Sequence, residues 1–209
     1  METNAHVKNL TRKILLNIAV RRAKSGSGSS KQFLMKRTTV MKWLDFTPIF
    51  GRIKWAVVGA VATRHYMPER NTQDMDIIVS ALVAKKVREK LIHAGFKYQS
   101  ELFIGGASWI SPNRKSIDVL EGNQEWLDEA LTQAKNNKDK QGLLILPFEY
   151  LILMKYQASR VQDLADISRM LGQANEQMLS VTKKLFNLYE PYSLKDLENL
   201  IVLGKLEMN

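Results

Sequence analysis

Two aspartates separated by one residue are the feature of this chain best suited to chemistry. Asp74 and Asp76 flank Met75 and lead into the apolar run 77–79, which predicts a strand containing all of them. Side chains two apart in a strand point to the same side, so both carboxylates would face one place. Like charges this close are unfavourable unless a cation lies between them. Carboxylate oxygens suit Mg²⁺, which also contacts substrate phosphates, so the pair predicts half of a metal–nucleotide site.

A third carboxylate, Asp118, lies between two apolar residues, where a charge is expected only if it is paired or binds a metal. The runs 105–110 and 115–120 predict two strands of a hairpin, because the residues between them favour a turn. Three carboxylates on neighbouring strands can hold two divalent ions. One ion would activate an attacking hydroxyl, and the other would stabilise leaving pyrophosphate.

A small-residue turn at Gly59-Ala60 precedes the aspartates. It follows an apolar strand that begins at Trp55, and a short helical pattern comes after it. Free backbone amides and the helix dipole favour anions at such a helix start, so we expect this turn to cradle phosphate.

Together these elements resemble the nucleotidyltransferase superfamily, especially its minimal and abortive-infection toxin-type members. That pattern is a hydrophobic strand, Gly-Ser or Gly-Gly, about a dozen residues, Asp-h-Asp-h and a later acidic strand. Here 13 residues separate Ala60 from Asp74. The string from Arg70 to Asp76 matches the subgroup form Arg-x-Thr-x-Asp-x-Asp, and residues 146–167 match its helix with Lys, a small residue, Arg and Asp-x-x-Asp. The resemblance covers about residues 53–171.

The resemblance implies an Mg²⁺-dependent enzyme that transfers a nucleoside monophosphate from a nucleoside triphosphate to a hydroxyl of RNA or protein. By resemblance, the catalytic and metal-binding residues are Asp74, Asp76 and Asp118, the catalytic lysine is Lys155, and the nucleotide-binding residues are Gly59, Ala60, Arg70 and Thr72. The implied partners are the triphosphate, tRNA or another acceptor, and a cognate antitoxin protein in a toxin–antitoxin or phage-defence pair. Ala60 departs from the pattern because it lacks the usual serine hydroxyl, which leaves open a degenerate module that only binds nucleotide, RNA or a partner protein.

Lys155 has two interpretations from its own surroundings. It lies among apolar residues of a predicted helix, so it either extends to solvent or points toward phosphate in a cleft. The resemblance favours phosphate. Arg160, Asp163 and Asp166 are spaced three apart, which favours a structural network of ion pairs.

The elements that must position these residues predict a mixed α/β (α+β) fold. We expect a small mixed sheet covered by helices and then a C-terminal helical tail. The expected elements after the second aspartate are a helix over 81–94, strands near 96–104, 106–111 and 115–120, a helix over 124–135, a buried strand over 143–146, and helices over 147–159, 161–171, 174–189 and 193–204. Gly172 and Pro191 are expected to break the tail helices.

The charge of the chain is concentrated near its start. Of 209 residues with net charge +10, residues 1–54 hold 12 Lys/Arg and 2 Asp/Glu, and the remainder holds 19 of each. Residues 7–22 predict a basic amphipathic helix that would bind nucleic acid, dock on the domain or lie on a membrane surface. A flexible Gly/Ser stretch over 25–30, native or artificial, follows it.

These patterns predict three regions: a basic N-terminal extension over 1–34, a nucleotidyltransferase-like core over 35–146 and a helical region over 147–209 packed on the core. No apolar run reaches the roughly 18 residues of a membrane span. The absence of Cys excludes disulfides and thiolate chemistry and is compatible with the cytoplasm, which is the expected location.

Overall fold

The computed structural model describes residues 12–21, 42–67, 72 and 74–208. They belong to two compact units. One, the core unit, is Arg37–Pro147, and the other, the helical unit, combines Met1–Lys36 with Phe148–Asn209.

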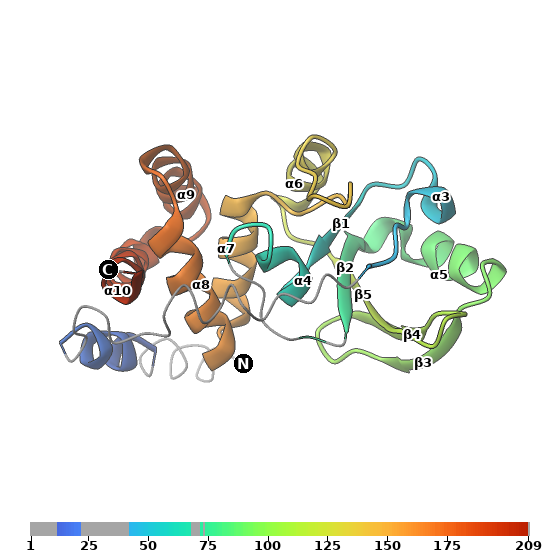
Figure 1. Ribbon diagram of the computed structural model, residues 1–209, viewed down its shortest axis with the longest axis horizontal. Helices are drawn as coiled ribbons and strands as arrows, with labels where there is room; N and C mark the ends of the chain where they lie inside the picture. Colours follow the sequence, from blue (N-terminus) through green and yellow to red (C-terminus); the bar gives the residue numbers. More distant parts are fainter. Residues whose placement is uncertain (1–11, 22–41, 68–71, 73, 209) are drawn as a thin grey trace. The chain divides into compact units, whose positions relative to one another are not determined.

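A five-stranded mixed sheet is the centre of the core unit (Figure 1). Its strands are β1 (Trp55–Val58), β2 (Met75–Ser80), β3 (Lys97–Glu101), β4 (Gly106–Ile110) and β5 (Ser116–Gly122). The order across the sheet is β1-β2-β5-β4-β3, in which β2 and β5 are parallel and the other neighbours are antiparallel. The mixed α/β class and the predicted β4–β5 hairpin are confirmed.

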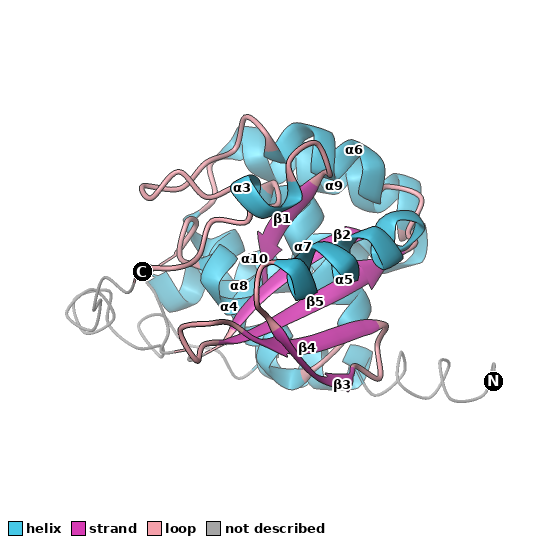
Figure 2. Ribbon diagram, turned by 90° about the vertical axis from the view of Figure 1, so that its right-hand side faces the viewer, coloured by secondary structure: helices cyan, strands magenta, loops and turns pink. Residues whose placement is uncertain are grey.

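The helices of the core unit are short. They are α3 (Thr47–Phe50), α4 (Gly59–Thr63), the 3₁₀ turn η1 (Ala81–Val83), α5 (Ala84–His93) and α6 (Leu127–Ala134). Figure 2 shows α5 crossing in front of the sheet. Arg88 of α5 holds this position, since its guanidinium donates to Glu121 of β5 at 2.8 Å and to Glu101 of β3 at 2.6 Å.

Aromatic side chains fill the space beneath α3 and beside β1. The ring of Phe46 lies 5.1 Å from Phe50, 5.6 Å from Trp55 and 5.9 Å from Phe96, measured between centroids. All four side chains are buried. Burial of such large apolar surfaces is the main stabilising contribution that a core of this size has.

The prediction of a buried strand over 143–146 is wrong. Leu143, Ile145 and Leu146 are buried, but only isolated bridges form there, between Val57 and Ile145 and between Lys138 and Leu144. The segment still extends the β1 edge, because the Val57 N–H donates to the Leu144 carbonyl at 2.7 Å. An apolar run alone cannot distinguish such an extended segment from a full strand.

The C-terminal part of the chain is helical, as predicted. Its elements are α7 (Phe148–Ala158), α8 (Val161–Gln173), α9 (Glu176–Tyr189), the 3₁₀ turn η2 (Pro191–Ser193) and α10 (Leu194–Met208). The break predicted at Gly172 comes just after that residue, because α8 ends at Gln173 and α9 begins at Glu176. Gly172 lies against Gly204 of α10, and a Cβ on Gly172 would lie 2.3 Å from the Gly204 carbonyl oxygen. The glycines allow two helix backbones to meet.

A helix over 12–21 docks in the helical unit through Arg12. The Arg12 guanidinium lies 4.0 Å from the centre of the Tyr156 ring and 3.4 Å from the Asp196 carboxylate. It also donates to the Ser159 hydroxyl at 2.6 Å. The sequence left three roles open for the predicted basic helix: binding nucleic acid, docking on the domain or lying on a membrane surface. For residues 12–21 these contacts show docking. The Gly/Ser stretch over 25–30 lies outside the described residues.

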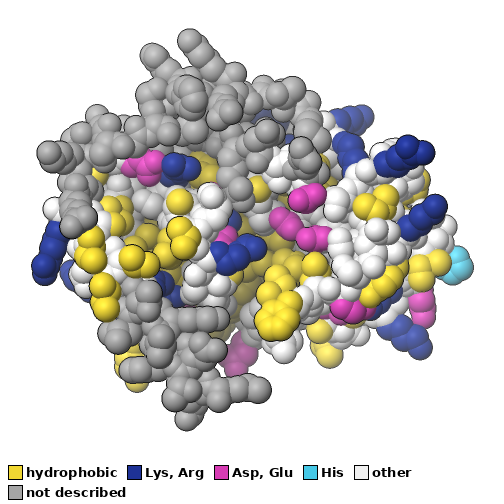
Figure 3. Space-filling model, turned by 90° about the horizontal axis from the view of Figure 1, so that it is seen from below, with side chains coloured by type: hydrophobic (Ala, Val, Ile, Leu, Met, Phe, Trp, Pro, Cys, Tyr) yellow, Lys and Arg dark blue, Asp and Glu magenta, His cyan; other side chains and the backbone are white. Residues whose placement is uncertain are grey.

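Charge on the described surface is mixed. Six of the twelve Lys and Arg of residues 1–54 lie in the described ranges 12–21 and 42–54. On the face in Figure 3 the basic side chains, drawn in dark blue, are scattered among apolar and acidic ones. In the portion of the chain that is described, no helix is long and apolar enough to cross a membrane.

The contact between α8 and α10 yields a prediction. Gly204→Ala would place a Cβ 2.0 Å from the Ser168 carbonyl oxygen and 2.6 Å from the Gly172 amide nitrogen. We expect it to force the helices apart and to lower the free energy of unfolding by about 1–3 kcal/mol, measured by urea denaturation. Val202→Ala, at a half-exposed position of the same helix, is the control and should change stability much less. Equal stability of the Gly204→Ala variant and the parent would contradict the close packing.

Candidate active site

The chain turns from β1 into α4 at Gly59, and the candidate site lies at this turn. Its φ is +62°, in the left-handed region that favours glycine. A Cβ at this position would lie 1.8 Å from Oδ2 of Asp76. Val58 and Asp76 are direct partners across the β1–β2 pair, which brings the carboxylate to the turn. Only glycine fits between this backbone and that carboxylate.

Asp76 and Asp118 lie side by side on neighbouring strands. They are register partners in the parallel pair β2–β5, so their side chains share one face about 4.8 Å apart along the hydrogen-bonding direction. Both are half-buried, whereas the residues before and after each of them face the other side and are buried. Two carboxylates in this arrangement repel each other unless a cation or proton is shared between them.

The sequence reasoning missed that the acidic pair continues as a polar row. Ser108 of β4 is the register partner of Asp118, and Ser100 of β3 is the partner of Ser108. The row therefore crosses four strands as Asp76, Asp118, Ser108 and Ser100. The predicted hairpin contained the signal for Ser108, since it lies as far before the turn as Asp118 lies after it.

Asp74 does not lie in the strand, which corrects the expectation from sequence. Strand β2 begins at Met75, and Asp74 is exposed just before it. Thr72, predicted to bind nucleotide, donates its hydroxyl to the Asp74 carbonyl oxygen at 3.2 Å. Arg70 lies outside the described residues. Among those residues that are described, no three acidic or His side chains are grouped so that they could hold a metal ion by themselves.

Ala60 follows Gly59 in α4 and is buried, with 3% of its surface exposed. The Thr63 hydroxyl donates to its carbonyl oxygen at 2.8 Å and helps to close this short helix. The backbone turn that the motif requires is thus present without the usual serine. The nucleotide-binding roles of Gly59 and Ala60 stay predictions.

The end of the α4 segment is hydrogen-bonded to the segment that follows α6. The Tyr66 hydroxyl donates to the Leu146 carbonyl oxygen at 3.1 Å. The Asn137 amide donates to the Tyr66 hydroxyl at 2.6 Å and to the Ile145 carbonyl oxygen at 2.9 Å. These bonds hold the residues after α4 in place.

Lys155 belongs to the helical unit and is 4% exposed. Its ammonium donates to Asp163 at 3.0 Å and to Asp166 at 2.9 Å. Arg160 also donates to Asp163, at 2.6 Å. The structural interpretation of the two aspartates agrees with these contacts. A phosphate or catalytic role for Lys155 stays a prediction, and it would have to compete with two carboxylates.

Burial and neighbouring charges shift the pKa of the Asp163 carboxyl group in opposite directions. Burial alone would raise the pKa of its carboxyl group, but hydrogen bonds and positive charge from Arg160 and Lys155 outweigh burial and lower the pKa below its usual 3.8. The carboxylate is therefore the stable form in the folded chain.

Comparison with known proteins finds likeness in structure only. No protein-family model matches the chain, and no curated protein matches its sequence. Among solved structures, the antibiotic-resistance factor ANT(2'')-Ia is similar, with 13% identity and a TM-score of 0.44 over 69% of this chain and 86% of that chain. The lincomycin-bound lincosamide antibiotic adenylyltransferase LnuA has 17% identity and a TM-score of 0.41 over 60% and 89%.

The Cid1 poly(U) polymerase has 18% identity and a TM-score of 0.30 over 77% of this chain and 52% of that chain. At this identity and TM-score the likeness concerns general fold, and no residue role or substrate follows from it.

The close approach at Gly59 predicts a coupled pair of substitutions. Gly59→Ala should destabilise the core by about 1–3 kcal/mol, because the new Cβ meets the Asp76 carboxylate and the backbone has a positive φ. In the Asp76→Ala background the carboxylate is gone, so the same substitution should be less costly. Urea denaturation of both single variants and the double variant measures the coupling. Strictly additive effects would contradict the contact.

The buried ion pairs of Asp163 predict a pH dependence. Asp163→Asn should lower stability by about 2 kcal/mol near neutral pH. Because the folded-state pKa is below the usual 3.8, the contribution of the carboxylate is fully present above that value and is lost as pH falls through the lowered pKa. Thermal melts should therefore show the two proteins converging in acid. Asp128→Asn, at an exposed ion pair, is the control, and a gap that persists in strong acid would contradict this account.

Proposed function

We propose that this chain is a metal-dependent nucleotidyltransferase, which transfers a nucleoside monophosphate from a nucleoside triphosphate to a hydroxyl of RNA or protein. The observation that carries the proposal is the paired carboxylates of Asp76 and Asp118, with the Gly59 turn directly against one of them.

The donor set fits Mg²⁺. That ion is usually held by one or two carboxylates together with substrate phosphates and water, so Asp76 and Asp118 suffice on the protein side. Asp74, exposed at the entry to β2, is near in sequence and would complete a two-ion site. When bound, the metal would neutralise phosphate charge and increase the acidity of the attacking hydroxyl.

The residues of the chain have separate tasks in this proposal. The Gly59 backbone allows the triphosphate to approach the acidic pair without a side chain in the way. Asp118 accepts the proton of the acceptor hydroxyl as the new oxygen–phosphorus bond forms at the α-phosphate. The bond between the α-phosphate and pyrophosphate breaks, and pyrophosphate leaves. Arg70 and Thr72 would contact the phosphates, and positioning with charge neutralisation would supply most of the rate.

The finer parts of the proposal rest on the motif resemblance alone. They are a tRNA or other RNA acceptor, a toxin–antitoxin or phage-defence setting with an antitoxin partner, and action in the cytoplasm. Lys155 as a catalytic residue belongs to the same group.

A second candidate is a degenerate module that binds nucleotide, RNA or a partner without turnover. Two observations favour it: Ala60 has no hydroxyl to offer, and the Lys155 ammonium is engaged by Asp163 and Asp166. This candidate predicts nucleotide binding that is indifferent to the Asp118 carboxylate.

Transfer from α-labelled nucleoside triphosphates distinguishes the two candidates. With total RNA and cell extract as acceptors, we expect Mg²⁺-dependent labelling that falls by about a hundredfold or more in Asp76→Asn and Asp118→Asn. Chelation of the metal should abolish it.

Glu125→Gln is the matched control, because it removes an exposed carboxylate elsewhere in the core unit and should label as the parent does. Full activity of Asp76→Asn would exclude the proposed mechanism. Calorimetric binding of a triphosphate with no labelling by any of the four donors would select the binding module.

A further inference from the structure

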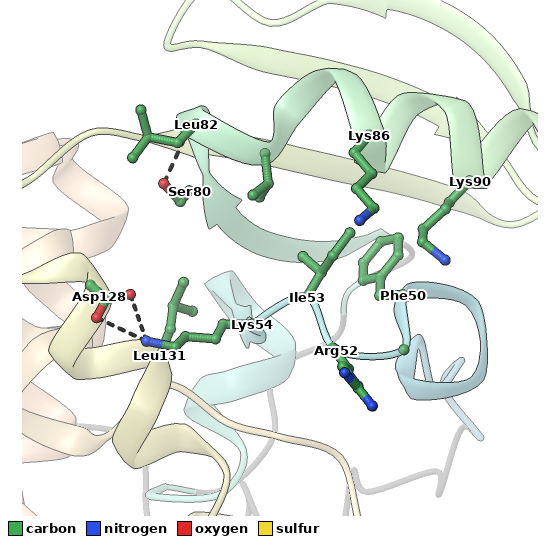
Figure 4. A pocket seen from close by; sticks show the side chains of 12 residues that line it. Phe50, Arg52, Ile53, Lys54, Ser80, Leu82, Lys86, Lys90, Asp128 and Leu131 are labelled. Atoms are coloured by element: carbon green, nitrogen blue, oxygen red, sulfur yellow. Dashed lines mark hydrogen bonds and ion pairs between the residues drawn. The ribbon is translucent and has the colours of Figure 1, made fainter.

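A cationic pocket lies in the core unit at the end of the sheet where β1 begins and β2 ends. The cavity has a volume of about 570 Å³. The segment Phe50–Lys54, which leads into β1, forms one wall, and Ser80 with the following helices α5 and α6 forms the others (Figure 4). This size is within the range of pockets for small organic ligands.

The pocket is separate from the candidate active site. Asp76 lies at the start of β2 and Ser80 at its end, so about 13 Å of strand separates them. Asp76 is paired with Val58, the last residue of β1, whereas the pocket is lined by Lys54, which directly precedes the first residue of that strand. The two sites therefore occupy opposite ends of the β1–β2 pair.

Four basic side chains and one carboxylate line the pocket: Arg52, Lys54, Lys86, Lys90 and Asp128. The Lys54 ammonium donates to both Asp128 oxygens, at 2.7 and 2.8 Å, so this pair is internally neutralised. The remaining three cations give the lining a net charge of +3.

Two of the three remaining cations point toward the hollow. Figure 4 shows Lys86 and Lys90 extending from α5 toward the segment 50–54, whereas Arg52 points away from both of them. Lys86 is exposed and has no ion pair with any described carboxylate. Lys90 donates one hydrogen bond to the Ile49 carbonyl oxygen at 3.2 Å, which leaves two of its three N–H groups for a ligand. Cations that converge on a hollow with a low-dielectric wall raise the local potential for anions.

The same pocket has an apolar side. Phe50 and Leu131 are each 1% exposed and form its floor, and Leu82 is 97% exposed at its rim. An isolated exposed leucine needs no explanation, but one that borders a pocket with buried apolar walls adds contact area for a ligand. The lining thus complements a molecule that carries both an anionic group and an apolar group.

We propose that this pocket binds a small organic phosphate, in which a phosphomonoester contacts Lys86 and Lys90 and an apolar group covers Leu82 and the floor. Ammonium groups bind phosphate as point charges, and both lysines extend from the same helix to the same side of the pocket. The volume of about 570 Å³ favours a small molecule over a polynucleotide, which would follow an extended surface. The proposal does not depend on the proposed nucleotidyl transfer.

Titration calorimetry with phenyl phosphate tests this proposal, with inorganic phosphate as the anion alone and a short single-stranded RNA as the polyanion. We expect phenyl phosphate to bind more tightly than inorganic phosphate, because only it covers the apolar side. Lys86→Gln/Lys90→Gln should weaken phenyl phosphate binding by roughly tenfold or more. Asp118→Asn should leave it unchanged.

Lys85→Gln/Lys97→Gln is the matched control, since it also removes two positive charges from the core unit but neither residue lines the pocket. Retained binding in this control supports the site. An equal loss in both double variants would show that binding reflects general attraction by charge, which would contradict a specific pocket. No binding of phenyl phosphate to the parent protein would overturn the proposal. Binding of the RNA alone, with loss in Lys86→Gln/Lys90→Gln, would overturn it in favour of a polyanion surface.

Discussion

The repulsion between two neighbouring carboxylates is the constraint around which the core unit is arranged. Asp76 and Asp118 are partners on adjacent parallel strands, so the backbone register keeps them together whatever their side chains do. Gly59 brings its backbone against Asp76, where any other residue would collide with the carboxylate. A fold that places like charges on adjacent strands spends stability unless a cation or proton offsets their repulsion, and this is expected where the charges have a function such as holding a cation.

The helical unit contains a buried cluster of opposite charges. Lys155 is enclosed with Asp163 and Asp166, and Arg160 adds a second cation to Asp163, so the charges there are balanced within the protein. Buried pairs of this kind contribute little net stability relative to apolar residues, but removal of one partner is costly. The carboxylates of this cluster are engaged by cations of the protein itself, so a role for them in metal binding would require these contacts to break.

Several features could be predicted from sequence because they depend on local patterns. The acid-x-acid pair, the turn at Gly59 and the later hairpin with Asp118 all have short-range signals, and the helical tail shows continuous helical periodicity. Features set by contacts between distant segments could not be predicted. Nothing in the sequence shows that Gly204 lies against Gly172. The role of Asn137 likewise depends on Tyr66, which is 71 residues away.

The β1–β2 pair carries opposite charges at its two ends, and this has a consequence for ligand binding. At the acidic end, a phosphate can approach Asp76 and Asp118 only if a cation reverses the local charge. At the other end, Lys86 and Lys90 already supply positive charge, so an anion needs no metal there. Metal dependence therefore separates the two sites physically. Phosphate binding that persists without divalent ions belongs to the basic end, and phosphate binding that requires them belongs to the acidic pair.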